Sequence, residues 1–189
     1  PVKEAVLSEQ LGISRAPIRE ALQVLVQEGL ITSEPQKGKH VRQMTGKEIY
    51  DSYVVAGILE GAGVAESLPL WTEANMETFR AVVRQMEGKI SYATKLDELA
   101  EIDELFHATL FMACDNTRLV EMARTSCATI SKYLYYQHWI TMFTPREYAD
   151  RHHAVAEAVY SRDVKHVETA LRDHYKETGL RMAQFGKEA

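Results

Sequence analysis

Apolar residues recur at helical spacing through most of this 189-residue chain, beginning close to its start. Leu7 and Leu11 stand four residues apart and predict a short helix. Gly12 follows at the point where a sharp helix exit requires a positive φ, and Ser14 can cap a second helix. The spacing therefore predicts two helices joined by a tight turn, which is a helix-turn-helix.

The second of these helices has an apolar face and a basic face. Ile18, Leu22 and Leu25 recur at helical spacing and face inward, whereas Arg15 and Arg19 project from the first turns on another face. The N-terminal residues of a recognition helix are those that reach bases and phosphates in the major groove. We expect this helix to contact DNA through Arg15 and Arg19, with Ser14 at its start as a further contact.

After Gly29 the pattern changes to two short β-rich runs, residues 30–34 and 40–44, on either side of a turn at Pro35 to Lys39. A helix-turn-helix followed by such a hairpin is a winged helix. Lys37, Gly38 and Lys39 at the hairpin tip are typical of an ordinary solvated turn. Behind a recognition helix, however, glycine between two cations favours a phosphate or minor-groove contact.

From about residue 45 onward the chain shows apolar residues at helical spacing and no strand pattern of any length. The predicted fold is mainly α, with an N-terminal winged helix-turn-helix and a C-terminal antiparallel helical bundle. Thr144-Pro145-Arg146-Glu147 forms a capping box with proline at the first helical position. We expect helices near 46–68, 72–90, 94–114, 116–141, 145–161 and 163–185.

The pattern divides the chain into a DNA-binding domain, 1–44, and an all-helical effector, metal-binding and dimerisation domain, 45–189. Winged-helix domains usually have another helix upstream of the helix-turn-helix. We expect that first helix to be either missing from this numbering or disordered.

The net charge of −5 argues against a nucleic-acid partner only until it is divided along the chain. Residues 1–44 carry +1 and the remainder carries −6, and most of the early cations lie on the second helix and the hairpin. Cys114 and Cys127 lie inside helical patterns without metal-ligand spacing, so we interpret both as buried thiols. No apolar run approaches the about 20 residues of a membrane span, and the first residues show no signal-peptide pattern, so we expect a cytoplasmic protein with no membrane partner.

A second group of chemically distinctive residues lies in the helical half. Asp103 and His107 stand four residues apart and share one helix face. His152 falls in line with the apolar side of its helix, whereas His153 is turned away, and His174 lies on the apolar stripe of the last helix. A buried histidine is usually a satisfied core residue, but a buried carboxylate beside it favours a metal, because an unpartnered buried carboxylate is costly.

Three imidazoles and one carboxylate from three helices suit a borderline divalent metal. Zinc is the first choice, and nickel, cobalt, iron(II) and manganese(II) are chemically possible. Four protein ligands can close a structural site or leave positions open where a small carboxylate binds.

The segment LSEQLGISRAPIREALQVLVQEGLI resembles the DNA-binding segment of GntR-type transcription regulators. In that resemblance Arg15 and Arg19 match arginines that contact DNA, and Gly38 matches the glycine at the tip of the wing. The segments DELFHATLFMACDN, RHHAVAEAVYSRD and ALRDHY resemble the helical FCD domain of the FadR subfamily. By resemblance, Asp103, His107, His152 and His174 match that domain's Asp-His-His-His metal ligands.

The resemblance implies a homodimer that binds a pseudo-palindromic operator in double-stranded DNA and responds to a small organic acid bound beside the metal. Many relatives hold that acid with an arginine four residues before a glutamate, but this chain has Ala56 four residues before Glu60. A carboxylate then needs another partner. The candidate effector contacts are Arg80, Arg84, Arg124, Asn116, Tyr133 and Gln137.

The leading hypothesis is a ligand-responsive transcription regulator that is not an enzyme. One alternative is a metal-dependent hydrolase, in which the cluster activates water. The sequence offers no obvious general base for it and it leaves the DNA-binding half unexplained. The other alternative is a metal sensor, in which the metal itself is the signal.

Overall fold

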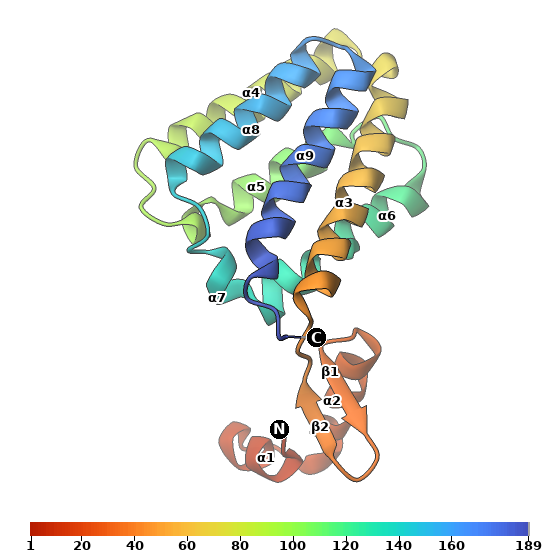
Figure 1. Ribbon diagram of the computed structural model, residues 1–189, viewed down its shortest axis with the longest axis vertical. Coiled ribbons are helices and arrows are strands. Elements are labelled where there is room, and N and C mark those ends of the chain that lie inside the picture. Colours follow the sequence, from red (N-terminus) through yellow and green to blue (C-terminus); the bar gives the residue numbers. More distant parts are fainter. Residues whose placement is uncertain (189) are drawn as a thin grey trace.

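The computed structural model describes residues 1–188, which form a small winged-helix domain joined by a narrow junction to a helical bundle (Figure 1). The first domain contains α1 (Glu4–Leu11), α2 (Arg15–Gln27), β1 (Ile31–Glu34) and β2 (Gly38–Val41). The bundle contains α3 (Gly46–Ser67), the 3₁₀ helix η1 (Leu68–Leu70), α4 (Glu73–Ile90), the 3₁₀ helix η2 (Leu96–Leu99), α5 (Ala100–Leu110), α6 (Thr117–Ser126), the π-helix η3 (Ile130–Leu134), α7 (Tyr136–Trp139), α8 (Pro145–Tyr160) and α9 (Val164–Ala183).

The helix-turn-helix forms where the sequence predicts it. Gly12 has φ +65° and ends α1, and Ile18 and Leu22 of α2 pack against Ile31 of β1. Ser14 occupies the N-cap position of α2 with an extended backbone, but its side chain makes no capping hydrogen bond. The expected side-chain cap is therefore absent, which leaves the Ser14 hydroxyl exposed at the start of the recognition helix.

Strands β1 and β2 pair antiparallel, with Ile31 opposite Val41 and Glu34 opposite Gly38. The turn covers residues 35–37, so it is shorter than the expected Pro35 to Lys39. The difference arises because Gln36 and Gly38 adopt positive φ values of 67° and 81°, which reverse the chain early and return Gly38 to the ladder.

The core of the bundle is built around α3 and α9, which lie side by side (Figure 1). Two glycines permit this close approach. A Cβ at Gly57 of α3 would lie 2.9 Å from the Cβ of Tyr175, and a Cβ at Gly179 of α9 would lie 2.8 Å from the Cβ of Tyr53. Both positions therefore need glycine for the helices to stay in contact.

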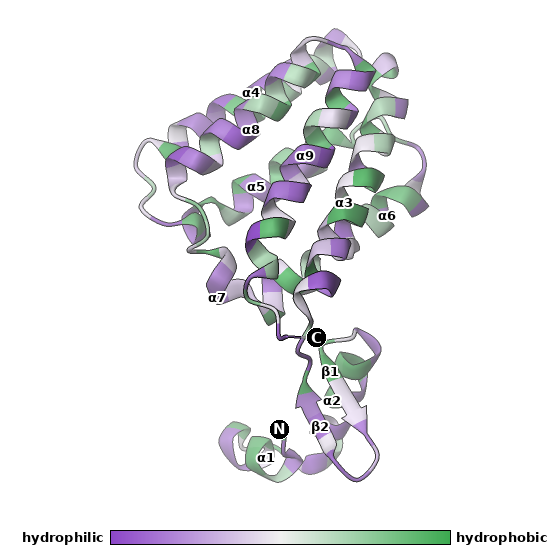
Figure 2. Ribbon diagram, in the orientation of Figure 1, coloured by the Kyte–Doolittle hydropathy of each residue, from purple (hydrophilic) through white to green (hydrophobic). Residues whose placement is uncertain are grey.

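Green apolar stretches alternate with purple polar ones along α4, α8 and α9, as expected of helices with one buried face (Figure 2). The starts of α3, α4 and α8 carry capping boxes, made by Thr45 with Glu48, Thr72 with Asn75, and Thr144 with Glu147. The third of these is the box that the sequence predicts, including Pro145 at the first position.

Two of the six expected long helices are broken. The segment 94–114 is a 3₁₀ turn followed by α5, and the segment 116–141 is split into α6, η3 and α7. Near the second break, Thr125 and Ser126 donate from their hydroxyls to the carbonyls of Glu121 and Met122, at 2.9 and 2.6 Å. Such bonds compete with the backbone ladder and bend helices, and a π-helix follows directly.

Residues Gly46–Leu70, which are α3 and η1, are long and apolar enough to cross a membrane by length and composition alone, with a mean hydropathy of 1.2. Half of the apolar 18-residue window within it is buried inside the structure. It also carries the buried carboxylate of Glu60. The buried apolar residues of α3, such as Ile49, Tyr53 and Val64, therefore contribute to the core of the bundle.

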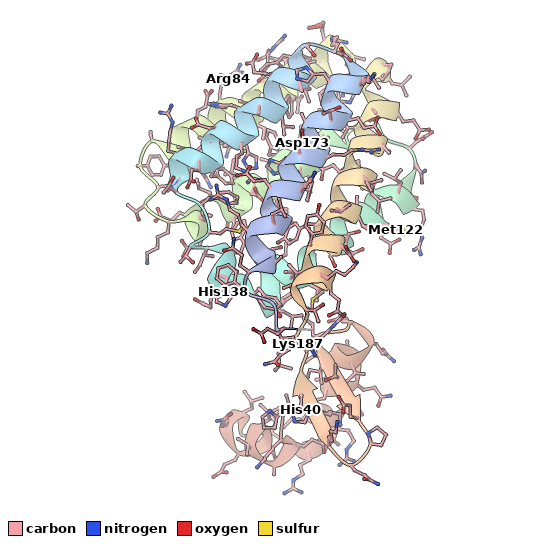
Figure 3. The ribbon with its side chains drawn as sticks, viewed as in Figure 1. His40, Arg84, Met122, His138, Asp173 and Lys187 are labelled. Carbon is pink, nitrogen blue, oxygen red and sulfur yellow. The ribbon has the colours of Figure 1, made fainter. Side chains whose placement is uncertain are left out.

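Residues of the helical bundle hold the junction between the two domains in place. Met44 is buried in a cluster with Ile49, Tyr135 and Met182, and its carbonyl accepts a hydrogen bond from the backbone of Lys187, at 2.9 Å. Lys187 lies beside the start of α3, at the narrowest part of the molecule (Figure 3). The last residues of the described chain thus fasten the connection that leads to the wing.

Candidate metal centre and nucleic-acid interface

Three helices bring the four candidate ligands together. Asp103 and His107 lie one turn apart on α5, His152 comes from α8 and His174 from α9. One ligand atom from each of the three histidines lies within 4.8 Å of those of the other two. Asp103 Oδ1 lies 3.1 Å from His152 Nε2 and 4.0 Å from His107 Nε2. The grouping chosen from periodicity is therefore also a spatial cluster.

In His107 and His152, the ring nitrogen Nδ1 has a hydrogen-bond partner outside the ligand set. His107 Nδ1 lies 2.7 Å from Glu60 Oε1, and His152 Nδ1 lies 2.8 Å from the carbonyl of Tyr148. Because an ionised carboxylate and a carbonyl only accept, Nδ1 carries a proton in both rings, which leaves Nε2 as the nitrogen that can bind a metal once it is deprotonated. This is the arrangement in which metal-binding histidines are usually held.

Two nitrogens of the cluster are buried without a hydrogen-bond partner in the described chain. They are Nε2 of His152 and Nδ1 of His174. The 3.1 Å separation between His152 Nε2 and Asp103 does not have the alignment of a hydrogen bond. Since buried polar atoms are normally paired, these unpaired nitrogens fit a site for a cation.

Glu60 of α3 is a partner that the sequence analysis did not select. It is 2% exposed, and its carboxylate bonds His107 and accepts from the hydroxyl of Tyr175. Burial works to lower the pKa of His107, but the charge and hydrogen bond of Glu60 outweigh it and raise that pKa to about 9. Burial lowers the pKa of His152, and burial together with the Arg151 charge lowers that of His174. Two of the three imidazoles are therefore kept neutral, as metal ligands must be.

A cavity of about 430 Å³ opens beside the cluster. Its wall includes the four candidate ligands and Glu60, and also three cationic side chains, Arg124, Lys132 and Arg151. The volume suits a small organic molecule.

Arg151 of α8 is the most enclosed of these cations, with its side chain 12% exposed. Its Nε donates to Glu177 at 2.8 Å and its Nη2 to the hydroxyl of Thr178 at 2.6 Å, while the guanidinium lies over the ring of Phe143. Within residues 1–188, Nη1 is the guanidinium nitrogen that has no hydrogen bond. Apolar spacing does not identify Arg151, because a charged residue in a helix is expected on the solvent side.

Of the six expected effector contacts, one lines the cavity and five lie outside its wall. Arg124 lines the cavity. Arg80 and Arg84 lie instead in a separate groove between α4 and α8, and Arg84 projects from the outer side of the bundle (Figure 3). Both are paired with Glu77, at 3.6 and 2.7 Å, so they are not placed to bind an acid beside the cluster.

The other three expected contacts also lie outside the cavity wall. Asn116 is the N-cap of α6, where its side chain accepts from the backbone of Leu119. Tyr133 is 65% exposed, and Gln137 is exposed as well. The break between α6 and α7 turns both side chains outward, whereas Tyr136, which the same tyrosine-rich segment also offers, lines the cavity. Ala56 is fully buried in α3 and is not part of the wall.

In the winged-helix domain, the predicted DNA-contacting residues lie on α2 and the wing. Ser14, Arg15 and Arg19 are exposed at the start of α2, and Lys37 and Gly38 are exposed at the wing. Lys39 is half-buried, because its ammonium is paired with Glu4 at 3.1 Å. Exposed cations at the first turns of this helix and on the wing are the features of a nucleic-acid interface.

A winged helix-turn-helix followed by a helical bundle with a cavity is the architecture of a bacterial transcription regulator. The chain matches the bacterial regulatory proteins of the gntR family over residues 1–41 and the FCD domain over residues 51–177. The chain belongs to this family, as a DNA-binding transcription regulator of the GntR type with an FCD domain, and it is not an enzyme.

Relatives support the same conclusion. The chain is 26% identical to the HTH-type transcriptional repressor RspR of Escherichia coli (strain K12), over 100% of this chain and 82% of that protein. It is 28% identical to the Nta operon transcriptional regulator of Aminobacter aminovorans, over 80% of this chain and 69% of the relative. The solved structure of E. coli McbR/YncC has the same fold, with a TM-score of 0.72 and 19% identity, over 97% of this chain and 86% of that one.

Proposed function

We propose that this protein is a ligand-responsive transcription regulator of the FadR subfamily that works in the cytoplasm. A homodimer binds a palindromic operator, and a small carboxylate in the cavity beside a metal ion changes its affinity for that operator. One observation carries the proposal. The segment that forms one wall of the cavity also holds the connection to the DNA-binding domain, through Tyr135 and Met44.

DNA recognition is attributed to the exposed face of α2 and to the wing. Arg15 and Arg19 reach the major groove, Ser14 donates its free hydroxyl to a phosphate, and Lys37, Gly38 and Lys39 approach the backbone from the wing. Two copies place their recognition helices about 34 Å apart, one turn of DNA. Val55 and Ile58 stand three residues apart on α3 with 46% and 41% exposure and supply an apolar pair for contact between the copies.

The metal is attributed to Asp103, His107, His152 and His174, and zinc is the first choice. The unpaired buried nitrogens and the fixed Nδ1 protons support this set. A divalent cation held by these residues would supply a Lewis acid for the carboxylate of an effector. The carboxylate of Asp103, as a ligand, and that of Glu60, through its hydrogen bond to His107, would balance the two positive charges of the ion.

The organic acid is attributed to the cavity that contains the cluster. With Ala56 in place of the family's arginine, this chain retains a cationic wall through Arg151 and Arg124. The N–H groups of Arg151 Nη1 are available as donors, because Glu177 and Thr178 bind only Nε and Nη2 and hold the guanidinium in place. A donor held this way loses little freedom when it binds an anion.

A change in the cavity reaches DNA through a short route. Cys127, Ser131 and Tyr136 line the cavity, and Tyr135 in the same segment contacts Met44. Occupation of the cavity shifts this segment, and the shift moves Met44 and the two recognition helices. The coupling exists because the acid prefers one arrangement of the segment and the operator prefers the other.

The test begins with purified protein, whose metal is identified by elemental analysis and whose operator is selected from a random DNA library. Organic acids are then screened by thermal shift on the metal-loaded protein. Arg151→Gln should abolish the shift that the best acid produces, whereas Arg84→Gln, outside the cavity, should preserve it. Equal shifts in the two variants would remove Arg151 from the proposal.

The same material separates a metal sensor from an acid-responsive regulator. If the metal is the signal, chelation alone changes operator affinity, and added acid has no effect on the loaded protein. In the proposed mechanism, chelation first lowers thermal stability and acid binding.

A further inference from the structure

Glu4 of α1 joins the recognition helix to the wing. Its Oε2 accepts from Arg19 Nη2 at 3.1 Å and Nε at 3.3 Å, and its Oε1 accepts from Lys39 Nζ at 3.1 Å. A single carboxylate thus bonds two of the cations on the predicted DNA-contacting surface, from two different elements. The hydrogen bonds from Arg19 and Lys39 lower the pKa of Glu4, so the carboxylate is charged at neutral pH.

Two of the remaining cations of this domain are paired with other acids. Lys37 pairs with Glu34 beside it on the wing, and Arg42 pairs with Glu48 at the start of α3. Within the described residues, Arg15 has no ion pair. Glu4 is therefore the acid that connects α2 to the wing.

The geometry at Arg19 leaves one edge of its guanidinium available. Glu4 occupies the Nε and Nη2 edge, whereas the edge formed by Nη1 and Nη2 still has donors. Two donors on one edge are what an arginine uses to bind O6 and N7 of a guanine. A carboxylate on the adjacent edge fixes the plane of the guanidinium and lowers the entropy cost of that contact.

We propose that Glu4 determines the sequence specificity of DNA binding. It holds Arg19 in the orientation that favours a base, and it partly neutralises Arg19 and Lys39 toward phosphates in any sequence. A protein without the Glu4 charge binds all DNA more tightly and distinguishes its operator less well. This inference rests on the proposed contact of Arg19 with DNA.

The test compares Glu4→Gln with Glu9→Gln. Glu9 lies on the same helix, is exposed and has no ion pair within residues 1–188, so it matches the charge change without the contacts. Fluorescence anisotropy at fixed salt gives the affinity of each protein for the operator selected by the wild type and for a scrambled duplex of equal length. A salt series on the scrambled duplex reports how many phosphates are neutralised.

Glu4→Gln should tighten binding to the scrambled duplex and steepen its salt dependence. It should also lower the ratio of operator to scrambled affinity by about tenfold, the equivalent of one charge-assisted hydrogen bond. In an Arg19→Gln background, the same change at Glu4 should leave the ratio unaltered. If the ratio of operator to scrambled affinity in Glu4→Gln equals that of the wild type or of Glu9→Gln, the inference is overturned.

If Glu4→Gln does not fold, Glu4→Asp carries the test, because the shorter side chain cannot reach both cations. The ratio of operator to scrambled affinity in Glu4→Asp should then fall below that in Glu9→Asp. Equal ratios in these two variants overturn the inference. A wild-type protein that selects no sequence from the library contradicts the proposed function itself. One that selects an operator regardless of the residue at position 4 contradicts only the role of Glu4.

Discussion

The hydroxyl of Tyr135 makes two hydrogen bonds to the backbone of Met44, although 91 residues separate them. It accepts from the Met44 N–H at 2.9 Å and donates to the Met44 carbonyl at 3.1 Å. Both residues are buried. A side chain from the segment that also lines the cavity, through Ser131 and Tyr136, thus fixes the backbone that enters the DNA-binding domain.

Tyr135→Phe should weaken the coupling between acid binding and operator binding. The ring remains packed, but the buried Met44 N–H loses its partner, so the free energy of unfolding should fall by about 1 to 3 kcal/mol. Operator binding and acid binding should both persist, while the effect of acid on operator affinity should shrink. Thermal melting and anisotropy titration measure these quantities. Tyr92→Phe, at a 69% exposed position, is the control, and full coupling in Tyr135→Phe would exclude the proposed route.

His152→Ala and His153→Ala form a matched pair at adjacent positions. His152 is 1% exposed and faces the cluster, whereas His153 contacts Glu87 at the outer face of α8, at 3.1 Å. His152→Ala should lose the metal in elemental analysis and also the stability that the metal confers, which is about 2.7 kcal/mol at a hundredfold excess over Kd. His153→Ala should keep both. Equal metal content in the two variants is the result that the proposed ligand set does not allow.

Glu60→Gln tests the carboxylate that orients His107. Loss of such a partner usually weakens metal affinity by about 10- to 100-fold. Isothermal titration with zinc measures the change, and Glu66→Gln, exposed on the same helix, should leave the affinity as it is. If Glu60→Gln binds zinc as tightly as the wild type, Glu60 has no role in the metal site.

Cys127 provides a pH-dependent test of the cavity wall. Burial, together with the charges of Glu60 and Asp103, raises the pKa of this thiol to about 12. Because the thiolate is the reactive form, iodoacetamide at pH 8 should modify Cys127 roughly a thousandfold more slowly than free cysteine. The rate should rise about tenfold per pH unit up to that pKa. Peptide mass spectrometry measures it, with Cys127→Ser as the control, and modification as fast as free cysteine would show that the wall is open to water.

The sequence predicts the four candidate ligands because each lies on a clear helical face. It misses Glu60 because the glycines around it in α3 leave no regular apolar stripe from which burial can be inferred. It misplaces Tyr133 and Gln137 because hydroxyl bonds and a π-turn interrupt a helix that the apolar spacing alone predicts as continuous. The contact between Tyr135 and Met44 depends on tertiary packing between distant segments, and local patterns do not contain that information.

The central claim is that the contents of the cavity control the affinity for DNA. The most direct test is an anisotropy titration of the selected operator with metal-loaded protein, in the presence and absence of a saturating concentration of the best organic acid. We predict at least about a fivefold change in operator affinity, the lower end of typical allosteric couplings, and no change in His152→Ala. An operator affinity that is the same with and without the acid, in a protein shown to bind it, would contradict the account.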